Sequence, residues 1–137
     1  MALTGRDIDR LIGVHPTLVT AITEILDAMA AAGHPMFVVQ GVRTVAQQQA
    51  LYARGRTTPP IGSKFIVTMK DGVTHRSNHQ PHADGYGHAV DCAFSGVVNP
   101  FGDQMPWEDY GKRVEAAGLI WGGRWSHPHD SPHAELV

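Results

Sequence analysis

The C-terminal end of the chain carries side chains that could bind a metal ion and use it. Asp130 is followed three residues later by His133, and Glu135 comes two residues after that histidine. A neutral imidazole is the commonest zinc ligand, and a carboxylate nearby can take a proton from the water that zinc activates. Upstream, His79 and Asp91 offer a second imidazole and an acidic ligand. Two histidines, an aspartate and a separate carboxylate predict the chemistry of a catalytic zinc hydrolase.

The chain contains nine histidines, so the ligands must be chosen among several candidates. Alternate side chains of a strand point to opposite faces, so in the predicted strand from His88 to Phe94 the side chains of His88 and Asp91 do not meet. Alanines beside Asp91 leave room for an ion. A buried aspartate satisfied by the backbone or by an arginine is an equally good interpretation of Asp91. His79 and His82 both lie in the preceding loop, and the local pattern does not choose between them.

The same ambiguity exists near the C-terminus. His133 and Glu135 share one face of the predicted final strand, which we place at Ala134 to Val137, while Asp130 lies in a turn before Pro132. His127 and His129 compete with His133 as ligands. For each histidine taken alone, a solvated or hydrogen-bonded role is the more common one, and only the joint pattern favours a metal.

Composition limits the classes of protein to which the chain could belong. Its 137 residues suit one domain, 1–137, with a hydrophobic core. The net charge of −2 gives no basic footprint for nucleic acid, and the single cysteine, Cys92, excludes an intrachain disulfide or a thiolate zinc cluster. The charged N-terminus lacks the apolar stretch of a secretory signal, and no apolar run approaches the roughly 20 residues of a membrane span. We expect a monomer that binds neither nucleic acid nor membrane.

Periodicity and breakers predict helices first and strands later. The clearest helix runs from Pro16 to Ala32, with shorter ones over 5–12, 44–53 and 106–117. Strands are expected at 36–40, 88–94, 119–121 and 134–137, and Asp71-Gly72 predicts a hairpin between strands at 65–69 and 73–75. This order predicts an α+β fold in which N-terminal helices pack on a small antiparallel sheet.

The candidate ligands also match a known family. Ser77-Asn-His79, Gly87-His-Ala-Val-Asp91 and Asp130-Ser-Pro-His133 resemble the zinc signatures of the D-Ala-D-Ala carboxypeptidase and L-alanyl-D-glutamate peptidase family, Ser-x-His…Gly-x-Ala-x-Asp and Asp/Glu-x-x-His. The similarity runs from about Val38 to the end of the chain and is greatest to single-domain phage endolysins. It also includes the segments 40–44, 47–52, 53–57, 66–68 and 118–125. The resemblance implies the hedgehog-like fold of these zinc metallopeptidases.

Carried over residue by residue, the resemblance implies that His79, Asp91 and His133 bind Zn²⁺ and that Asp130 is the general base for the zinc-bound water. It further implies that Arg43 anchors a substrate carboxylate and that Ser77 is a polar support in the same cleft. We also place Trp121 in the substrate site, where it and Trp125 could wall the cleft; plain packing is an equally good interpretation of both.

One feature departs from the family pattern. Seven residues, Gln80 to Tyr86, separate the histidine from the glycine of the signature where the family usually has two, so the chain carries an insertion of five residues. We expect a longer surface loop that folds back to keep His79 near Asp91, and His82 inside the insertion is the alternative ligand.

The resemblance implies hydrolysis of bacterial peptidoglycan. We expect a bacteriolytic endolysin that cleaves the L-Ala–D-Glu bond of the stem peptide. The alternatives are a D-alanyl-D-alanine carboxypeptidase and a non-catalytic zinc-containing binding module of the hedgehog type. We expect the protein to remain in the host cytoplasm until a separate membrane-permeabilising protein releases it to the cell wall or periplasm.

Overall fold

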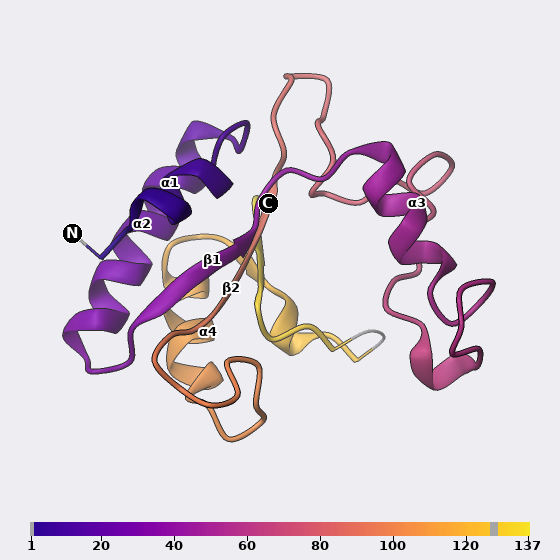
Figure 1. The fold of residues 1–137 in the computed structure, drawn as a ribbon. Coiled ribbons are helices and arrows are strands. Elements are labelled where there is room, and N and C mark those ends of the chain that lie inside the picture. The colour runs from indigo at the N-terminus through magenta and orange to yellow at the C-terminus, as the bar shows by residue number, and fades with distance from the viewer. Residues whose placement is uncertain (1, 127–128) are drawn as a thin grey trace.

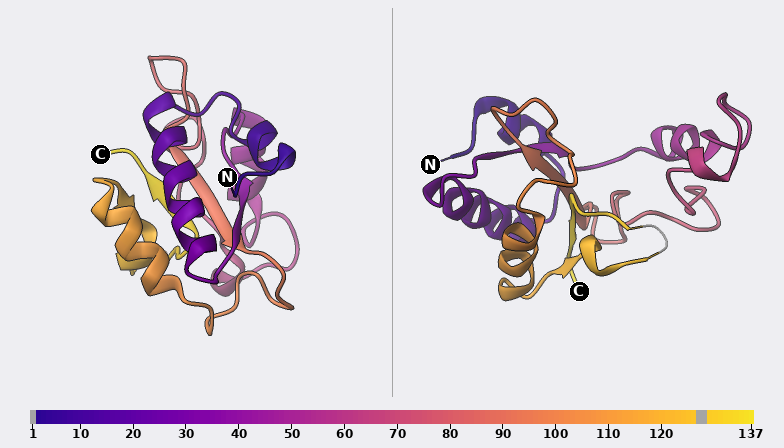
Figure 2. Two further views of the ribbon diagram at one scale, coloured as in Figure 1. Left: turned by 90° about the vertical axis from the view of Figure 1, so that its left-hand side faces the viewer. Right: turned by 90° about the horizontal axis from the view of Figure 1, so that it is seen from below.

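The first, second and fourth described helices lie on one side of a four-stranded sheet, and the third helix stands apart from the sheet (Figures 1 and 2). The structure, a computed structural model, describes residues 2–126 and 129–137. The helices are α1 (Gly5–Arg10), α2 (Pro16–Ala31), α3 (Val45–Ala53) and α4 (Trp107–Ala116), and the strands are β1 (Met36–Gln40), β2 (Ala89–Phe94), β3 (Ile120–Trp121) and β4 (His133–Glu135). Two 3₁₀ turns, η1 (Ser63–Phe65) and η2 (Gly122–Arg124), complete the described elements. The predicted α+β fold is confirmed.

Helix α2 forms where its sequence predicts it. Pro16 occupies the first turn, where its missing N–H has no helical partner to lose, and the His15 side chain accepts a hydrogen bond from the Thr17 N–H. The buried face packs over the sheet and consists of Leu18, Ile22, Ile25, Leu26 and Met29. This stripe repeats at the spacing of an amphipathic helix, so burial of its apolar side chains drives the packing of α2.

The sheet order is β1-β2-β4-β3, and all its pairs are antiparallel. Strand β2 lies inside the sheet and is fully apolar except for Asp91, which stands directly opposite His133 of β4. Directly opposed residues of an antiparallel pair project to the same face. The register therefore brings an aspartate and a histidine together that are far apart in the sequence. Strand β4 begins at His133, one residue earlier than predicted.

The predicted hairpin around Asp71-Gly72 is wrong. The segments 66–76 contain no strand in the described chain. The Asp71 carboxylate accepts the N–H groups of Val73 and His75 at 2.9 and 2.8 Å, so these donors are satisfied locally rather than by a partner strand. Gln48 of α3 also donates to the Lys70 carbonyl oxygen at 2.8 Å. Side-chain hydrogen bonds thus replace the ladder that a hairpin requires.

The described helices include none that is both long and apolar enough to cross a lipid bilayer.

Candidate metal centre and substrate cleft

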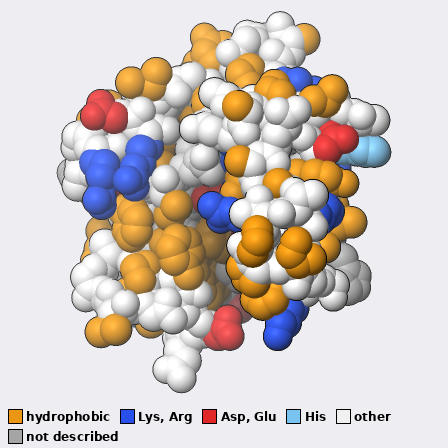
Figure 3. Space-filling model, turned by 45° about the vertical axis from the view of Figure 1, so that its right-hand side comes forward, with side chains coloured by type: hydrophobic (Ala, Val, Ile, Leu, Met, Phe, Trp, Pro, Cys, Tyr) orange, Lys and Arg blue, Asp and Glu red, His pale blue; other side chains and the backbone are white. Residues whose placement is uncertain are grey.

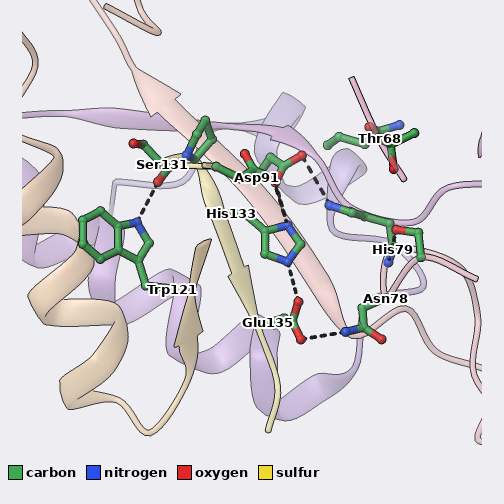
Figure 4. Close-up of polar contacts among 12 residues, drawn as sticks. Thr68, Asn78, His79, Asp91, Trp121, Ser131, His133 and Glu135 are labelled. Carbon is green, nitrogen blue, oxygen red and sulfur yellow. Dashed lines mark hydrogen bonds and ion pairs between the residues drawn. The ribbon is translucent and has the colours of Figure 1, made fainter. Parts of the chain in front are cut away.

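The three predicted ligands meet on one face of the sheet, at its two inner strands. His79, Asp91 and His133 each present one ligand atom, and these atoms all lie within 4.8 Å of one another (Figure 4). Asp91 projects from β2, His133 from the adjacent β4, and His79 from the loop that precedes β2. Among the described residues this is the one such cluster of histidine, cysteine and acidic side chains.

A backbone carbonyl fixes the orientation of the His79 ring. Nδ1 of His79 lies 2.8 Å from the carbonyl oxygen of Gly41, and the residue is only 2% exposed. A carbonyl oxygen only accepts, so Nδ1 carries the proton and Nε2 keeps its lone pair. Nε2 lies 3.3 Å from the Asp91 carboxylate. The predicted support from Ser77 is local: its hydroxyl accepts the N–H of His79 at 3.2 Å.

His133 is held between two carboxylates. Its Nδ1 lies 3.2 Å from Asp91 Oδ1, and its Nε2 lies 2.7 Å from Glu135 Oε1. Burial by itself lowers the pKa of His133, but the hydrogen bonds with Asp91 and Glu135 outweigh burial and raise the pKa to about 9. For Asp91, burial acts to raise the pKa, but the charges and hydrogen bonds of His79 and His133 outweigh burial and hold the pKa well below its usual range. The site therefore favours an ionised Asp91 next to positive charge.

Asp130 lies beside these ligands without being one of the three. Its Oδ2 is 3.7 Å from His133 Nδ1, and the side chain is 37% exposed. Burial and the charge of Asp91 raise the pKa of Asp130. The turn that carries it packs tightly against Gly122, where a Cβ would overlap the carbonyl oxygen of Asp130. The pair Asp91 and Asp130 thus divides into a strongly ionised carboxylate and a more basic one.

Arg43 is the basic side chain that lies beside Asp91. Its Nη2 lies 3.7 Å from Asp91 Oδ2, and the residue is 8% exposed. Its Nη1 donates to Gln48 Oε1 at 2.6 Å and its Nε to Gln40 Oε1 at 3.1 Å. Burial lowers the pKa of Arg43, while Asp91 and Asp130 act in the opposite direction. The sequence analysis did not assign either glutamine as a partner of Arg43. Gln48 lies five residues beyond Arg43, on helix α3, and its hydrogen bond with Arg43 ties that helix to the cleft.

The structure does not bring Trp121 to the cleft. Trp121 is 4% exposed, donates its indole N–H to the Ser131 carbonyl oxygen at 2.8 Å, and packs against Gly111 and Gly123. Packing is therefore its role in this fold. Trp125 lines the cleft instead, with its ring centroid 4.9 Å from that of His133.

The rival histidines lie elsewhere or outside the described residues. His82 stacks on His88 with ring centroids 3.7 Å apart, and His88 contacts Asp84 at 2.7 Å. His129 contacts the Trp125 carbonyl and the Ser131 hydroxyl. His127 lies outside the described residues. The structure thus brings His79, and not the alternative His82, to Asp91.

A cleft of about 1080 Å³ opens over this cluster. Figure 3 shows a hollow on this face with basic and acidic side chains in it. Besides the residues described above, its lining includes the basic side chains Arg54, Lys70 and Arg76 and the apolar side chains Leu51, Val67, Phe101 and Pro132. No described carboxylate lies within ion-pair distance of those three basic groups. A smaller pocket of about 500 Å³ adjoins it, and none of the three ligands is among the residues that line it, Arg76, Ser77, Asn78, Gln80, Pro81, His82 and Ala83.

Comparison with known proteins finds similarity to peptidases. The sequence pattern of a family described as D-alanyl-D-alanine carboxypeptidase matches residues 71–136, which include all three ligands and Asp130. The chain is 29% identical over 134 residues to the peptidoglycan L-alanyl-D-glutamate endopeptidase CwlK of Bacillus subtilis (strain 168), covering 90% of this chain and 74% of that protein.

Solved structures extend the similarity to the fold. The L-Ala D-Glu endopeptidase ChiX of Serratia marcescens superimposes with a TM-score of 0.58 at 28% identity, over 98% of this chain and 89% of that one. The vancomycin-resistance D,D-pentapeptidase VanY, in a complex with Zn(II), gives a TM-score of 0.62 at 17% identity, over 90% and 72% of the two chains. At that identity the second likeness concerns the fold alone.

Proposed function

We propose that this chain is a zinc peptidase of the family described as D-alanyl-D-alanine carboxypeptidase, and that it hydrolyses the L-Ala–D-Glu bond of peptidoglycan stem peptides. The observation that carries the proposal is the meeting of His79, Asp91 and His133 beside Asp130 in one open cleft. CwlK and ChiX match most of this chain, and both are named as L-Ala–D-Glu endopeptidases, which favours the endopeptidase over the carboxypeptidase.

The residues present suit zinc. His79 Nε2, His133 Nδ1 and a carboxylate oxygen of Asp91 would hold the ion, and two imidazoles with one carboxylate are a typical ligand set of catalytic zinc. Each imidazole has a hydrogen-bond partner for its other nitrogen, namely Gly41 and Glu135, as ligating histidines usually do. When bound, zinc supplies the Lewis acidity that makes water a nucleophile near neutral pH and stabilises charge on a carbonyl oxygen.

Asp130 is the proposed general base. Its raised pKa makes its carboxylate a better proton acceptor than Asp91, and its side chain is partly exposed in the lining of the cleft, which supports this role. The Asp130 carboxylate accepts the proton that the attacking water loses and then delivers it to the leaving amine.

Basic side chains of the cleft suit an anionic peptide. Arg43 has a fixed orientation because Gln40 and Gln48 hold it, and a guanidinium can bind a carboxylate through two parallel hydrogen bonds. Arg54, Lys70 and Arg76 add positive charge along the same cleft. A stem peptide carries free carboxylates that these groups can bind, while Trp125 and Phe101 offer apolar contact.

Mass spectrometry of purified peptidoglycan tests the proposal. We expect chelator-sensitive release of stem peptides with a new D-Glu amino terminus. Loss of terminal D-Ala alone would assign the chain to the carboxypeptidases, and zinc binding with an unchanged wall would favour a non-catalytic binding module.

Two substitutions separate the base from the ligands. Asp130→Ala should retain zinc and the fold but lose about 10²- to 10⁴-fold in turnover, since this is the usual contribution of general base catalysis. His133→Ala should lose zinc as well. Asp103→Ala and His34→Ala, at exposed positions that do not line the cleft, are the matched controls. Near-normal turnover of Asp130→Ala would refute its role as the base.

We also propose an endolysin role for this activity, with the protein held in the host cytoplasm until a separate membrane-permeabilising protein releases it. Its support is the resemblance to phage endolysins in the zinc signatures. Added from outside, the protein should lyse Gram-negative cells only after their outer membrane is permeabilised. Expressed inside, it should lyse cells only when a membrane-permeabilising protein is co-expressed.

A further inference from the structure

Glu135 makes two short contacts, one with a proposed metal ligand and one with the loop that carries another. Its Oε1 lies 2.7 Å from Nε2 of His133, and its Oε2 accepts a hydrogen bond from Nδ2 of Asn78 at 2.6 Å (Figure 4). The Glu135 side chain is only 12% exposed and that of His133 only 7%. Water therefore competes little for these contacts, which makes them stronger than the same contacts on the surface.

The contact with Glu135 determines which nitrogen of His133 faces the other ligands. An ionised carboxylate only accepts, so the Nε2 of His133 holds a proton and donates it to Glu135. The remaining nitrogen, Nδ1, faces Asp91. His79 has the opposite arrangement, with Nδ1 donating to Gly41 and Nε2 facing Asp91. The two imidazoles thus depend on two different partners to present their lone pairs to one point.

We propose that Glu135 is a positioning residue of the metal centre, which keeps the proton of His133 on Nε2 so that Nδ1 binds the ion, and that Asn78 holds Glu135 in place. This inference rests on the proposed binding of zinc by His79, Asp91 and His133. It adds two residues, Asn78 and Glu135, that act on the metal through His133 and do not touch it.

The backbone around Glu135 and Asn78 gives this contact a fixed frame. Strand β4 lies between β2 and β3, so Glu135 pairs with Ala89 on one side and Ile120 on the other. Asn78 accepts the N–H of His88, just before β2, at 2.7 Å through its carbonyl oxygen. Asn78 also directly precedes the ligand His79. The hydrogen bond between Asn78 and Glu135 therefore joins the loop of one histidine ligand to the strand of the other.

Zinc affinity of purified variants, measured by competition with a chromophoric chelator, tests the proposal. We expect Glu135→Ala to bind zinc about 10- to 100-fold more weakly, the usual effect of removing a partner of a ligating histidine. Glu135→Gln should also weaken binding, because its amide has one acceptor oxygen for two donors, His133 and Asn78. Glu24→Gln, at an exposed position of α2, removes the same charge and should bind as the wild type does.

A double substitution isolates the contribution of Asn78. Asn78→Ala should weaken zinc binding less than Glu135→Ala does. If Asn78 acts only through Glu135, then Asn78→Ala combined with Glu135→Ala should bind zinc no more weakly than Glu135→Ala alone. Additive losses would show that Asn78 acts by another route and would overturn that part of the proposal.

Nitrogen-15 NMR of the zinc-loaded protein reads the proton position directly, which a purely structural role of Glu135 would not change. We expect His133 to show a protonated Nε2 and a metal-bound Nδ1, and Glu135→Ala to lose this single pattern. A metal-bound Nε2 in the wild type, or unchanged affinity and shifts in Glu135→Ala, would overturn the role of Glu135 while leaving the metal centre standing. A wild-type protein that is folded and binds no zinc would instead refute the metal centre itself, and this inference with it.

Discussion

Removal of metal should make the stability of the protein depend on pH through His133. The ordinary pKa of the imidazole is 6.5, and in the folded protein Asp91 and Glu135 raise it to about 9. Each unit of difference corresponds to roughly 1.4 kcal/mol, so protonation of His133 stabilises the metal-free fold by about 3 kcal/mol. Because the folded pKa is the higher one, this stabilisation is complete below pH 6.5 and is lost as the pH rises through about 9. Asp91 stays ionised over this range, since its pKa lies well below its usual value.

Urea unfolding in the presence of a chelator measures this dependence. We expect the free energy of unfolding to fall by about 3 kcal/mol between roughly pH 6 and pH 10. A parallel series with His133→Gln should lack this component, so the difference between the two series isolates the imidazole from the other titrating groups. Saturating zinc should also abolish it, because the ion takes the place of the proton on Nδ1.

Two results would contradict this reasoning. If the wild type and His133→Gln lose the same free energy over the range, His133 is not the titrating group. If the difference between them appears only below pH 6.5, the folded protein holds the imidazole neutral, and the pair with Asp91 does not carry the charge assigned to it.

Three further substitutions test how the fold supports the site. Tyr110→Phe should lower the free energy of unfolding by about 1 kcal/mol in urea titrations, because it removes the hydrogen bond from the buried hydroxyl to the Pro132 carbonyl at 2.9 Å; an unchanged midpoint would contradict this. Gly111→Ala should lower the free energy of unfolding by about 1–3 kcal/mol, although alanine favours helices, because its Cβ would overlap the Trp121 ring. Gly5→Ala, whose Cβ would contact no atom, is the control, and equal unfolding midpoints of the two variants would refute the overlap. Gln48→Leu should lower peptidoglycan hydrolysis tenfold or more while the protein stays folded by circular dichroism, since a hydrogen bond to a charged group is worth about 1.5–3 kcal/mol and Arg43 loses it; full activity would show that Arg43 does not depend on Gln48.

The secondary structure was predictable where one local pattern determines it. The apolar stripe of Pro16–Ala31 and the apolar strands Met36–Gln40 and Ala89–Phe94 follow from periodicity and composition alone. The prediction of a hairpin at Asp71-Gly72 was wrong because the same two residues also occur in a loop where the aspartate carboxylate accepts backbone N–H groups. Local sequence preferences could not predict the hydrogen bond from Gln48 that holds this loop, since Gln48 lies on helix α3, far from the loop in the sequence.

The site was predictable in its residue types and less so in its partnerships. Asp91 and His133 meet as expected because opposed positions of β2 and β4 share a face, and the Gly41 carbonyl orients His79 toward them from the preceding loop. The roles of Trp121 and Trp125 could not be assigned, since both flank the same glycine pair and only the packing against Gly111 separates them. The contact between Asn78 and Glu135 spans 57 positions and depends on the sheet register, which no local pattern states.

The longer loop from Gln80 to Tyr86 leaves the metal centre intact because the fold fixes the two ends of the loop. The Asn78 carbonyl accepts the His88 N–H at 2.7 Å, so the chain returns beside its starting point however long the loop between them is. Gly87 makes this return possible, since a Cβ there would lie 3.0 Å from the His79 carbonyl oxygen and 3.1 Å from Val42. Its N–H donates to the Gly13 carbonyl oxygen, and its own carbonyl accepts the His15 N–H, which ties the loop base to the start of α2. The extra residues therefore extend outward as the loop at the top of Figure 1, and His79 keeps its place against Gly41 and Asp91.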